Sequence, residues 1–313
     1  MPVKQKLVVI IGPTAVGKTK TSIQLAKKFN GEIISGDSMQ VYRGMDIGTA
    51  KIKAEEMEAV PHYFIDIKDP LESYTVAEFQ QQGRAKIAEI ATRGLPMIVG
   101  GTGLYIQSVI YDYQFSQAVE NMEFRNELLK KAAQEGNAVL HDQLALVDPV
   151  SARRIHPNNL RRIVRALEIY ECTGKTMTEY LESQQKELLY DVILIGLTME
   201  REVLYERINA RVDAMMEEGL LSEVQSLYEQ NIRNVQSIQA IGYKELYDYL
   251  DGKLTLTEAI EQMKQNSRRY AKRQFTWFRN KMNVNWFDMT PRNDENKKIK
   301  EIIDFVAGKL GVK

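Results

Sequence analysis

The sequence has 313 residues, and its 42 Lys and Arg residues balance its 42 Asp and Glu residues. This balance excludes a strongly basic chain, so any affinity for nucleic acid must come from local clusters of charge. Cys172 is the single cysteine, which excludes an internal disulfide and a cysteine-based zinc site and favours a reducing compartment. The first apolar run, residues 7–11, is too short for a signal or membrane segment. We therefore expect a cytoplasmic protein that does not enter a membrane.

Short apolar runs alternate with longer helical patterns over the first third of the chain. Such continuous apolar runs are typical of strands that are buried on both faces of a parallel sheet. The later run from Asp191 to Leu197 has the same character and is expected to complete the sheet. The sequence therefore predicts an α/β fold with a parallel sheet flanked by helices. We predict strands at residues 6–11, 32–35, 62–67, 95–99 and 191–197, and helices at 18–29, 75–93, 201–218 and 256–279.

The middle of the chain lacks this alternation and shows only helical patterns from about residue 113 to residue 186. In the helix predicted to start at Asn158, the apolar positions 160, 163, 164 and 167 follow the i, i+3, i+4, i+7 spacing of one helix face. We therefore predict a core formed by residues 1–112 and 187–313, and an all-helical insertion formed by residues 113–186.

A phosphate-binding motif follows the first predicted strand. The run GPTAVGKT satisfies the pattern G-x-x-x-x-G-K-[ST] and leads into a predicted helix. Its glycines let backbone N–H groups turn toward phosphate oxygens, and the helix adds the positive end of its dipole. Lys18 supplies a charge near the terminal phosphates, and the Thr19 hydroxyl is suited to Mg²⁺. The motif predicts a P-loop NTPase-like core that binds a diphosphate or triphosphate through Gly12, Pro13, Thr14, Ala15, Val16, Gly17, Lys18 and Thr19.

The acidic residue that completes many P-loop sites is missing from its usual place. In many P-loop enzymes a second strand ends in an acid that helps to hold the metal. Neither the strand at 95–99 nor the strand at 191–197 ends in one, so the machinery for hydrolysis is incomplete. Asp37 follows the strand at 32–35 and is expected at the same edge of the sheet as the phosphate loop. Its carboxylate could be a general base, a metal ligand, or only a cap for a helix or turn.

Further segments match one known family in the same order along the chain. These segments are GDSMQVYRGMDIGTAK at 36–51, PHYFID at 61–66, VGGTGLY at 99–105, RIHPNNLRRIVRALEIY at 154–170, QAIGYKE at 239–245 and AKRQFTWFR at 271–279. Together with the phosphate loop, they resemble the tRNA dimethylallyltransferase family, also called tRNA isopentenyltransferases. The resemblance implies transfer of a dimethylallyl group from dimethylallyl diphosphate to N6 of an adenosine, with release of pyrophosphate. That adenosine lies on the 3′ side of the anticodon in tRNAs that read codons beginning with U.

The resemblance also implies roles for individual residues. Asp37 would accept the proton of the adenine amine, while Lys18 and Thr19, with Mg²⁺ at Thr19, would hold the leaving pyrophosphate. Arg207 would reach the phosphates, although a solvated helix face shared with Arg211 is the simpler interpretation. The residues expected to contact tRNA are Asp37, Ser38, Met39, Gln40, Thr102, Arg161, Arg162, Ile163, Val164, Arg165, Ala240, Ile241, Gly242, Tyr243, Lys244 and Glu245. Without the family, simple turn chemistry would be the favoured interpretation of Thr102.

Two groups of basic residues could bind an RNA backbone. Arg161, Arg162 and Arg165 lie opposite the apolar stripe of the insertion helix, which predicts that the insertion contacts the tRNA anticodon stem-loop. The second group lies at residues 264–281, where lysines and arginines are interleaved with aromatic residues that could stack on bases. Phe275 and Phe278 recur at helical spacing and are more simply explained as core residues.

Two other functions remain open at this point. A P-loop kinase would bind ATP and phosphorylate a nucleotide or small molecule, and an RNA-binding ATPase would bind RNA without forming a covalent product. The chain lacks the cysteines of the zinc finger that some eukaryotic family members carry, so it resembles the shorter bacterial form. We expect a monomer.

Overall fold

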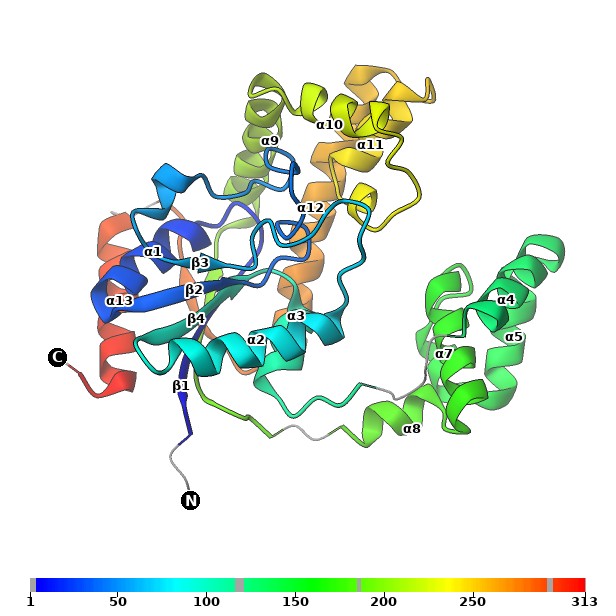
Figure 1. Cartoon of the computed structure of the whole chain (residues 1–313), viewed down its shortest axis with the longest axis horizontal. Coiled ribbons are helices and arrows are strands. Elements are labelled where there is room, and N and C mark those ends of the chain that lie inside the picture. Colours follow the sequence, from blue (N-terminus) through cyan, green and yellow to red (C-terminus); the bar gives the residue numbers. More distant parts are fainter. Residues whose placement is uncertain (1–3, 116–120, 185–186, 292–294, 313) are drawn as a thin grey trace. The chain divides into compact units, whose positions relative to one another are not determined.

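Figure 1 shows the computed structural model of the chain, which describes all residues except 1–3, 116–120, 185–186, 292–294 and 313. The chain divides into two compact units. The first, here called the sheet unit, comprises Met1–Ile110 and Leu188–Lys313, and the second, the helical unit, comprises Tyr111–Glu187. The predicted insertion lies within the helical unit, and its residues 116–120 and 185–186 fall outside the described part of the chain.

The sheet has six strands in the order β3-β2-β4-β1-β5-β6, and all neighbouring strands are parallel. This confirms the predicted α/β fold. Residues 7–11 of the central strand β1 are fully buried, because helices cover both faces of the sheet. The strands are β1 (Lys6–Ile11), β2 (Gly31–Ser35), β3 (His62–Tyr63), β4 (Leu95–Gly100), β5 (Asp191–Thr198) and β6 (Asn285–Asp288).

Both edges of the sheet differ from the sequence prediction. The strand predicted at 62–67 is reduced to β3, because Phe64 and Asp66 have φ values of 66° and 54°, which lie outside the extended region. At the other edge, β6 occupies a segment for which no strand is predicted. β6 has only four residues, none of them fully buried, so the sequence shows no apolar run there. The strand is recognised only by its pairing with β5.

The carboxyl ends of three strands lie side by side and place the loops that follow them. Ile11 of β1 pairs with Gly100 of β4, and Ser35 of β2 pairs with Val99 of β4. The loops that begin at Gly12, at residue 36 and at residue 101 therefore leave the sheet at the same edge. In an open parallel sheet this edge is where ligands bind.

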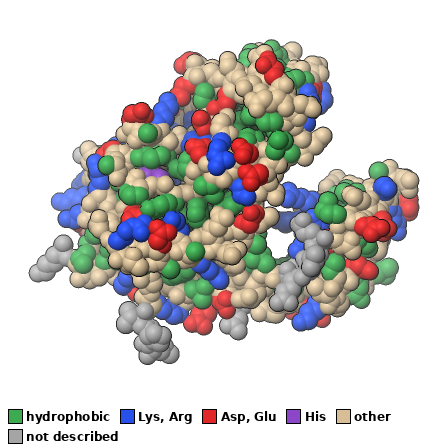
Figure 2. All heavy atoms as spheres, viewed as in Figure 1, with side chains coloured by type: hydrophobic (Ala, Val, Ile, Leu, Met, Phe, Trp, Pro, Cys, Tyr) green, Lys and Arg blue, Asp and Glu red, His purple; other side chains and the backbone are tan. Residues whose placement is uncertain are grey.

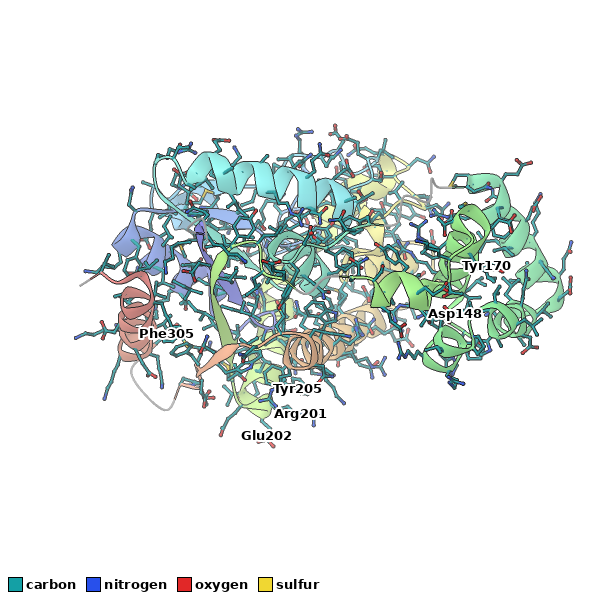
Figure 3. All side chains as sticks on the ribbon, turned by 90° about the horizontal axis from the view of Figure 1, so that it is seen from below. Asp148, Tyr170, Arg201, Glu202, Tyr205 and Phe305 are labelled. Atoms are coloured by element: carbon teal, nitrogen blue, oxygen red, sulfur yellow. The ribbon has the colours of Figure 1, made fainter. Side chains whose placement is uncertain are left out.

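Helices cover the two faces of the sheet (Figure 1). The crossover from β1 to β2, which contains α1, runs across the sheet in the opposite direction to the crossover from β3 to β4, which contains α2. Right-handed crossovers therefore put α1 and α2 on opposite faces. α13 joins α1, and its Phe305 packs against Phe287 of β6 with 5.4 Å between ring centroids (Figure 3). α3 packs on α2. These helices are α1 (Lys18–Phe29), α2 (Val76–Ile90), α3 (Gly103–Ile110) and α13 (Glu295–Leu310).

The rest of the sheet unit is helical and lies beyond the carboxyl ends of the strands. The longest helix, α12, begins with a capping box between Thr255 and Glu258. α12 contacts α9, α11 and α3. None of the helices in the described ranges is long and apolar enough to cross a membrane. The remaining elements are η1 (Ala54–Met57), α9 (Arg201–Glu217), α10 (Leu220–Glu229), η2 (Ser237–Gln239), α11 (Tyr243–Leu250) and α12 (Leu256–Lys281).

The helical unit has its own core and two buried acids. Asp148 caps α6 through the backbone N–H of Ser151 (2.9 Å) and also accepts from the backbone N–H of Thr178 (3.0 Å), which ties α6 to α8 (Figure 3). The fully buried Glu168 of α7 pairs with Arg125 (2.7 Å) and Arg165 (2.5 Å). The elements are α4 (Met122–Glu135), α5 (Asn137–Val147), α6 (Pro149–Arg154), α7 (Leu160–Thr173) and α8 (Met177–Glu182).

Candidate active site

A cavity of about 640 Å³ lies at the carboxyl edge of the sheet. Its walls are formed by residues 14–20, 37–40, 48–50, 99–101 and 239–241, together with side chains of α9 and α12. The cavity therefore brings the phosphate loop and the Asp37 segment together, as the strand order requires. Of the predicted site residues of the sheet unit that the structure describes, Gly12, Pro13, Thr102 and residues 242–245 are not part of its lining.

The phosphate loop has the backbone of an anion site. Gly17 has a φ of 100° and Ala15 a φ of 65°, so both residues lie in the left-handed region and turn the chain sharply before α1. No side chain caps the N-terminus of α1, and its first turn holds no acidic residue. The first N–H groups of the helix and its dipole are therefore available to a negatively charged ligand.

Lys18 lines the cavity and forms no ion pair within the described ranges of the chain. Its Nζ donates hydrogen bonds to the carbonyl oxygens of Gly12 (2.9 Å) and Pro13 (2.7 Å). Burial lowers the pKa of Lys18 to about 8; nearby Asp37 raises it in part, and Arg211 lowers it further. The ammonium group is thus predominantly protonated at neutral pH, but its partial removal from water makes the charged form costly. A bound diphosphate would remove that cost.

Asp37 uses one carboxylate oxygen for its own turn. Oδ1 accepts hydrogen bonds from the backbone N–H groups of Met39 (2.8 Å) and Gln40 (3.3 Å). The turn interpretation of this residue is therefore correct as far as Oδ1 is concerned. In the described part of the chain no group donates to Oδ2, and Asp37 lines the cavity. A second oxygen held in place by the turn can accept a proton, so the two interpretations are compatible.

Two arginines of α9 line the cavity, one turn apart. Arg211 donates from Nη1 to the Thr14 hydroxyl (3.4 Å), and burial lowers its pKa while the negative charge of Asp37 opposes that shift. Arg207 also lines the cavity but is exposed to solvent. The sequence favours Arg207 as the phosphate ligand, and the structure brings Arg211 into contact with the phosphate loop as well. Farther from the cavity on the same helix, Arg201 lies over the ring of Tyr205 (Figure 3).

Sequence reasoning does not predict that one face of α12 lines the cavity. Gln274, which is buried, accepts from the backbone N–H of Thr14 (3.2 Å) and donates to the carbonyl oxygen of Gly101 (3.1 Å), so it joins the phosphate loop to the turn after β4. Burial and the charge of Asp37 raise the pKa of Tyr270 to about 12, which keeps its hydroxyl protonated. Met263, Ser267, Tyr270 and Gln274 all line the cavity. Their spacing of four, three and four residues marks one helix face, and this polar stripe is the signal that was available in the sequence.

The family is identified by comparison with known proteins. A family model described as IPP transferase matches residues 40–281. The chain belongs to the IPP transferase family. The tRNA dimethylallyltransferase of Anoxybacillus flavithermus is 64% identical over 307 residues, which cover 98% of this chain and 97% of that protein.

Solved structures agree with this family assignment. The crystal structure of a tRNA isopentenylpyrophosphate transferase from Bacillus halodurans shares 58% identity and a TM-score of 0.75, covering 98% of this chain and 97% of the other. A eukaryotic dimethylallyltransferase, described as acting on tRNA, shares 34% identity and a TM-score of 0.81, covering 97% of this chain and 80% of the other. These are names of transferases that act on tRNA, so the kinase alternative gains no support from them.

Several residues predicted to contact tRNA have buried side chains. Ile163 and Val164 are 0% and 5% exposed and belong to the core of the helical unit, so their side chains cannot reach RNA without unfolding it. In the QAIGYKE segment, Tyr243 and Glu245 are buried as well, at 0% and 4% exposure. Glu245 instead accepts from the backbone N–H of Gly242 (2.8 Å) and from the Asn266 amide (2.7 Å).

Other predicted tRNA residues remain accessible. Arg161, Arg162 and Lys244 are exposed, whereas Arg165 is partly occupied by its ion pair with Glu168. Residues 38–40, 240 and 241 line the cavity, and Thr102 lies just outside its lining. The resemblance names segments of chain, and the fold decides which of their side chains are exposed or line the cavity.

The basic group on α12 is also partly engaged within the protein. Lys264 pairs with Asp213 (2.7 Å), and Arg268 donates to Asn209 (2.5 Å). The exposed members are Arg269, Lys272, Arg273, Arg279 and Lys281. Figure 2 shows basic and acidic side chains interspersed on the face in view. Phe278 is fully buried, as the helical spacing predicts, and Phe275 is half-buried against Trp286.

Proposed function

We propose that this transferase moves a dimethylallyl group from dimethylallyl diphosphate to N6 of an adenosine in tRNA. The adenosine is the one next to the anticodon on its 3′ side, in tRNAs that read codons beginning with U. One observation carries the proposal: the Asp37 carboxylate and the cations Lys18 and Arg211 line the same cavity. A base and an anion site that share one cavity suit a reaction in which a diphosphate leaves and a proton is removed.

The phosphate loop stabilises the leaving group. During transfer the bond between the allylic carbon and the bridging oxygen breaks, and pyrophosphate departs with the electron pair. The N–H groups at the start of α1, Lys18 and Arg211 supply positive charge where that negative charge develops. Because Lys18 and Arg211 are both disfavoured as buried cations, their interaction with an anion is stronger than it would be at a solvated surface.

Asp37 removes the proton from the adenine amine. The amine is a poor nucleophile because its lone pair is delocalised into the ring. As the new bond forms between N6 and carbon, one N6 proton passes to Oδ2 of Asp37, while Oδ1 stays in its turn. Because the target base is stacked in the anticodon loop, it has to leave the stack to enter the cavity.

Mg²⁺ fits the cavity as a metal shared with the substrate. Over the described ranges no cluster of three or more His, Cys, Asp or Glu side chains could hold a metal ion alone. Mg²⁺ is commonly held by one or two protein ligands together with substrate phosphates and water, and the exposed Thr19 hydroxyl at the cavity suits that role. Bound there, the ion would neutralise part of the charge on the diphosphate.

The exposed arginines of the helical unit and of α12 would bind the tRNA backbone. Arg161 and Arg162 on α7, with Arg269 and Arg273 on α12, are exposed and can reach phosphates. Nothing in the proposed reaction needs a second copy of the chain, so a monomer in the cytoplasm, where tRNA is found, is the simplest form of the proposal.

The test is a transfer reaction analysed at the level of nucleosides. The chain is incubated with Mg²⁺, dimethylallyl diphosphate and unmodified tRNAs of known anticodon, and the RNA is digested and examined by mass spectrometry. We expect N6-dimethylallyl adenosine at the position 3′ of the anticodon only in tRNAs that read U-initial codons. A parallel reaction with labelled ATP should yield no phosphorylated product. Absence of prenylated adenosine would refute the proposal.

A further inference from the structure

A glutamate outside the cavity holds a loop that forms part of its wall. Glu223 of α10 accepts hydrogen bonds from three successive backbone N–H groups, those of Asp46 (2.9 Å), Ile47 (2.8 Å) and Gly48 (3.1 Å). Residues 48–50 line the cavity, whereas Glu223 does not. A carboxylate that accepts several charge-assisted hydrogen bonds from consecutive amides fixes the conformation of that backbone.

Tyr243 completes this clamp. Its hydroxyl donates to Oε1 of Glu223 at 2.5 Å, and burial together with the charge of Glu223 raises its pKa, so it remains a donor. Its ring lies directly on Gly48, where an added Cβ would come within 2.5 Å of a ring carbon. Only glycine therefore fits at this position. The buried tyrosine of the QAIGYKE segment thus supports the wall of the cavity without lining it.

The clamped loop is connected to Asp37 through one side chain. The Nε2 of Gln40 donates to the carbonyl oxygens of Thr49 and Ala50, each at 3.2 Å. The backbone N–H of the same Gln40 donates to Oδ1 of Asp37 at 3.3 Å. A movement of residues 48–50 would therefore displace Gln40 and change the position of the carboxylate.

We propose that Glu223 is a positioning residue for prenyl transfer. Together with Tyr243 it holds residues 46–50, and through Gln40 it fixes the Asp37 carboxylate in the cavity wall. This inference rests on the proposed function, and it adds a residue that touches neither substrate. Transfer depends on the distance and angle between the base and the amine, so a displacement of about 1 Å can cost on the order of 10²-fold in rate.

The decisive experiment compares Glu223→Ala, Glu223→Gln and a control, Glu229→Gln, which changes an exposed glutamate on the same helix. We expect Glu223→Ala to lower kcat by roughly 10- to 100-fold, because the loop loses its acceptor. The dissociation constant for tRNA should not change, since Glu223 is not part of the substrate surface. Glu223→Gln should give an intermediate kcat, because its amide oxygen still accepts from two N–H groups. The control should match the wild type.

A second measurement separates positioning from a general loss of stability. Hydrogen exchange of the amides of residues 46–48 is followed in each variant at a temperature well below its melting point. We expect faster exchange at these amides in Glu223→Ala, with unchanged exchange in the strands of the sheet. Wild-type kcat together with wild-type exchange in that variant would overturn the inference.

Two further outcomes have defined meanings. If Glu223→Ala does not fold, Glu223→Gln and Tyr243→Phe are compared with the wild type instead. Tyr243→Phe keeps the ring and removes only the hydroxyl that donates to Glu223. A wild-type kcat in both variants would overturn the inference. If the wild type itself transfers no prenyl group, the proposed function fails, whereas exchange at residues 46–48 still shows whether Glu223 holds the loop.

Discussion

In the sheet unit, the half-buried cations Lys18 and Arg211 have no ion pair within the described part of the chain, whereas in the helical unit the buried Glu168 has two arginine partners. Burial lowers the pKa of both cations. For Glu168 burial would raise the pKa, but hydrogen bonds from Arg125 and Arg165 hold it below its usual value. A charge that is removed from water without a counter-ion is costly, so the cations of the cavity suit an anionic ligand, whereas Glu168 already has its counter-ions. The reactive site is therefore expected in the sheet unit, and RNA contacts on the exposed surface of the helical unit.

The largest effect is expected from removing the proposed base, Asp37. Asp37→Asn keeps an oxygen that can accept from Met39 and Gln40, but it cannot take a proton at neutral pH. We expect kcat to fall by roughly 10²-fold or more, the usual range for a general base, while tRNA binding is retained. Steady-state transfer kinetics and a binding titration measure the two quantities. Equal turnover in Asp37→Asn and the wild type would show that Asp37 serves only its turn.

The next largest effect is expected from removing the charge in the phosphate loop. Lys18→Ala should weaken binding of an unreactive dimethylallyl diphosphate analogue by roughly 10- to 100-fold, because charge-assisted hydrogen bonds are worth about 1.5–3 kcal/mol. Lys20→Ala is the matched control, since Lys20 also lines the cavity but pairs with Glu295 at the surface. Calorimetric titration gives the affinities. Similar losses of affinity in both variants would mean that the net positive charge near the cavity, and not the position of Lys18, determines binding of the analogue.

A sharper test separates the two arginines of α9. Arg211→Ala should reduce affinity for the diphosphate analogue by roughly tenfold, and Arg207→Ala by less, because Arg211 is half-buried and contacts the phosphate loop whereas Arg207 is exposed. The same titration measures both. The reverse order would favour Arg207, as the sequence alone suggests.

The lowered pKa of Lys18 also predicts a pH dependence. Below its pKa of about 8 the side chain is protonated and attracts the diphosphate, and above it the charge is lost. Affinity for the diphosphate analogue should therefore be highest at neutral pH and fall as pH rises through 8. The last proton of a terminal phosphate has a pKa of about 6, so the charge of the diphosphate changes little over this range. Titrations from pH 7 to pH 10 test this prediction. A wild-type affinity that does not change with pH would contradict it. The Lys18→Ala variant should bind the analogue weakly, with an affinity that does not depend on pH.

The smallest functional effect is expected in the helical unit. Replacing Arg161 and Arg162 with Ala should weaken tRNA binding a few-fold and reduce its salt dependence, with no loss of stability, because both side chains are exposed. Ile163→Ala, one position further along α7, should instead destabilise the helical unit by about 2–5 kcal/mol. Binding at several salt concentrations and thermal unfolding distinguish the two. Loss of affinity at constant stability in Ile163→Ala would restore its predicted RNA contact.

The features that the sequence predicts well are those fixed by the backbone. The motif from Gly12 to Thr19 follows the end of β1, and Asp37 follows the end of β2. The carboxyl ends of parallel strands meet at one edge of the sheet, independently of the side chains. A motif does not fix which way each of its side chains faces. Ile163 and Tyr243 belong to segments typical of the family, yet both face a core. The Glu223 clamp joins residues about 175 positions apart, for example Gly48 and Glu223, so no local pattern could reveal it.

The most direct measurement of the central claim follows both ends of the donor in one reaction. Dimethylallyl diphosphate with one label in the prenyl group and a different label in the diphosphate is incubated with the chain, Mg²⁺ and unmodified tRNA. We predict that the prenyl label enters the tRNA while the other label is released as intact pyrophosphate, because the loop around Lys18 grips a leaving group. Phosphate label in the tRNA, or release of single phosphate in place of pyrophosphate, would contradict this account.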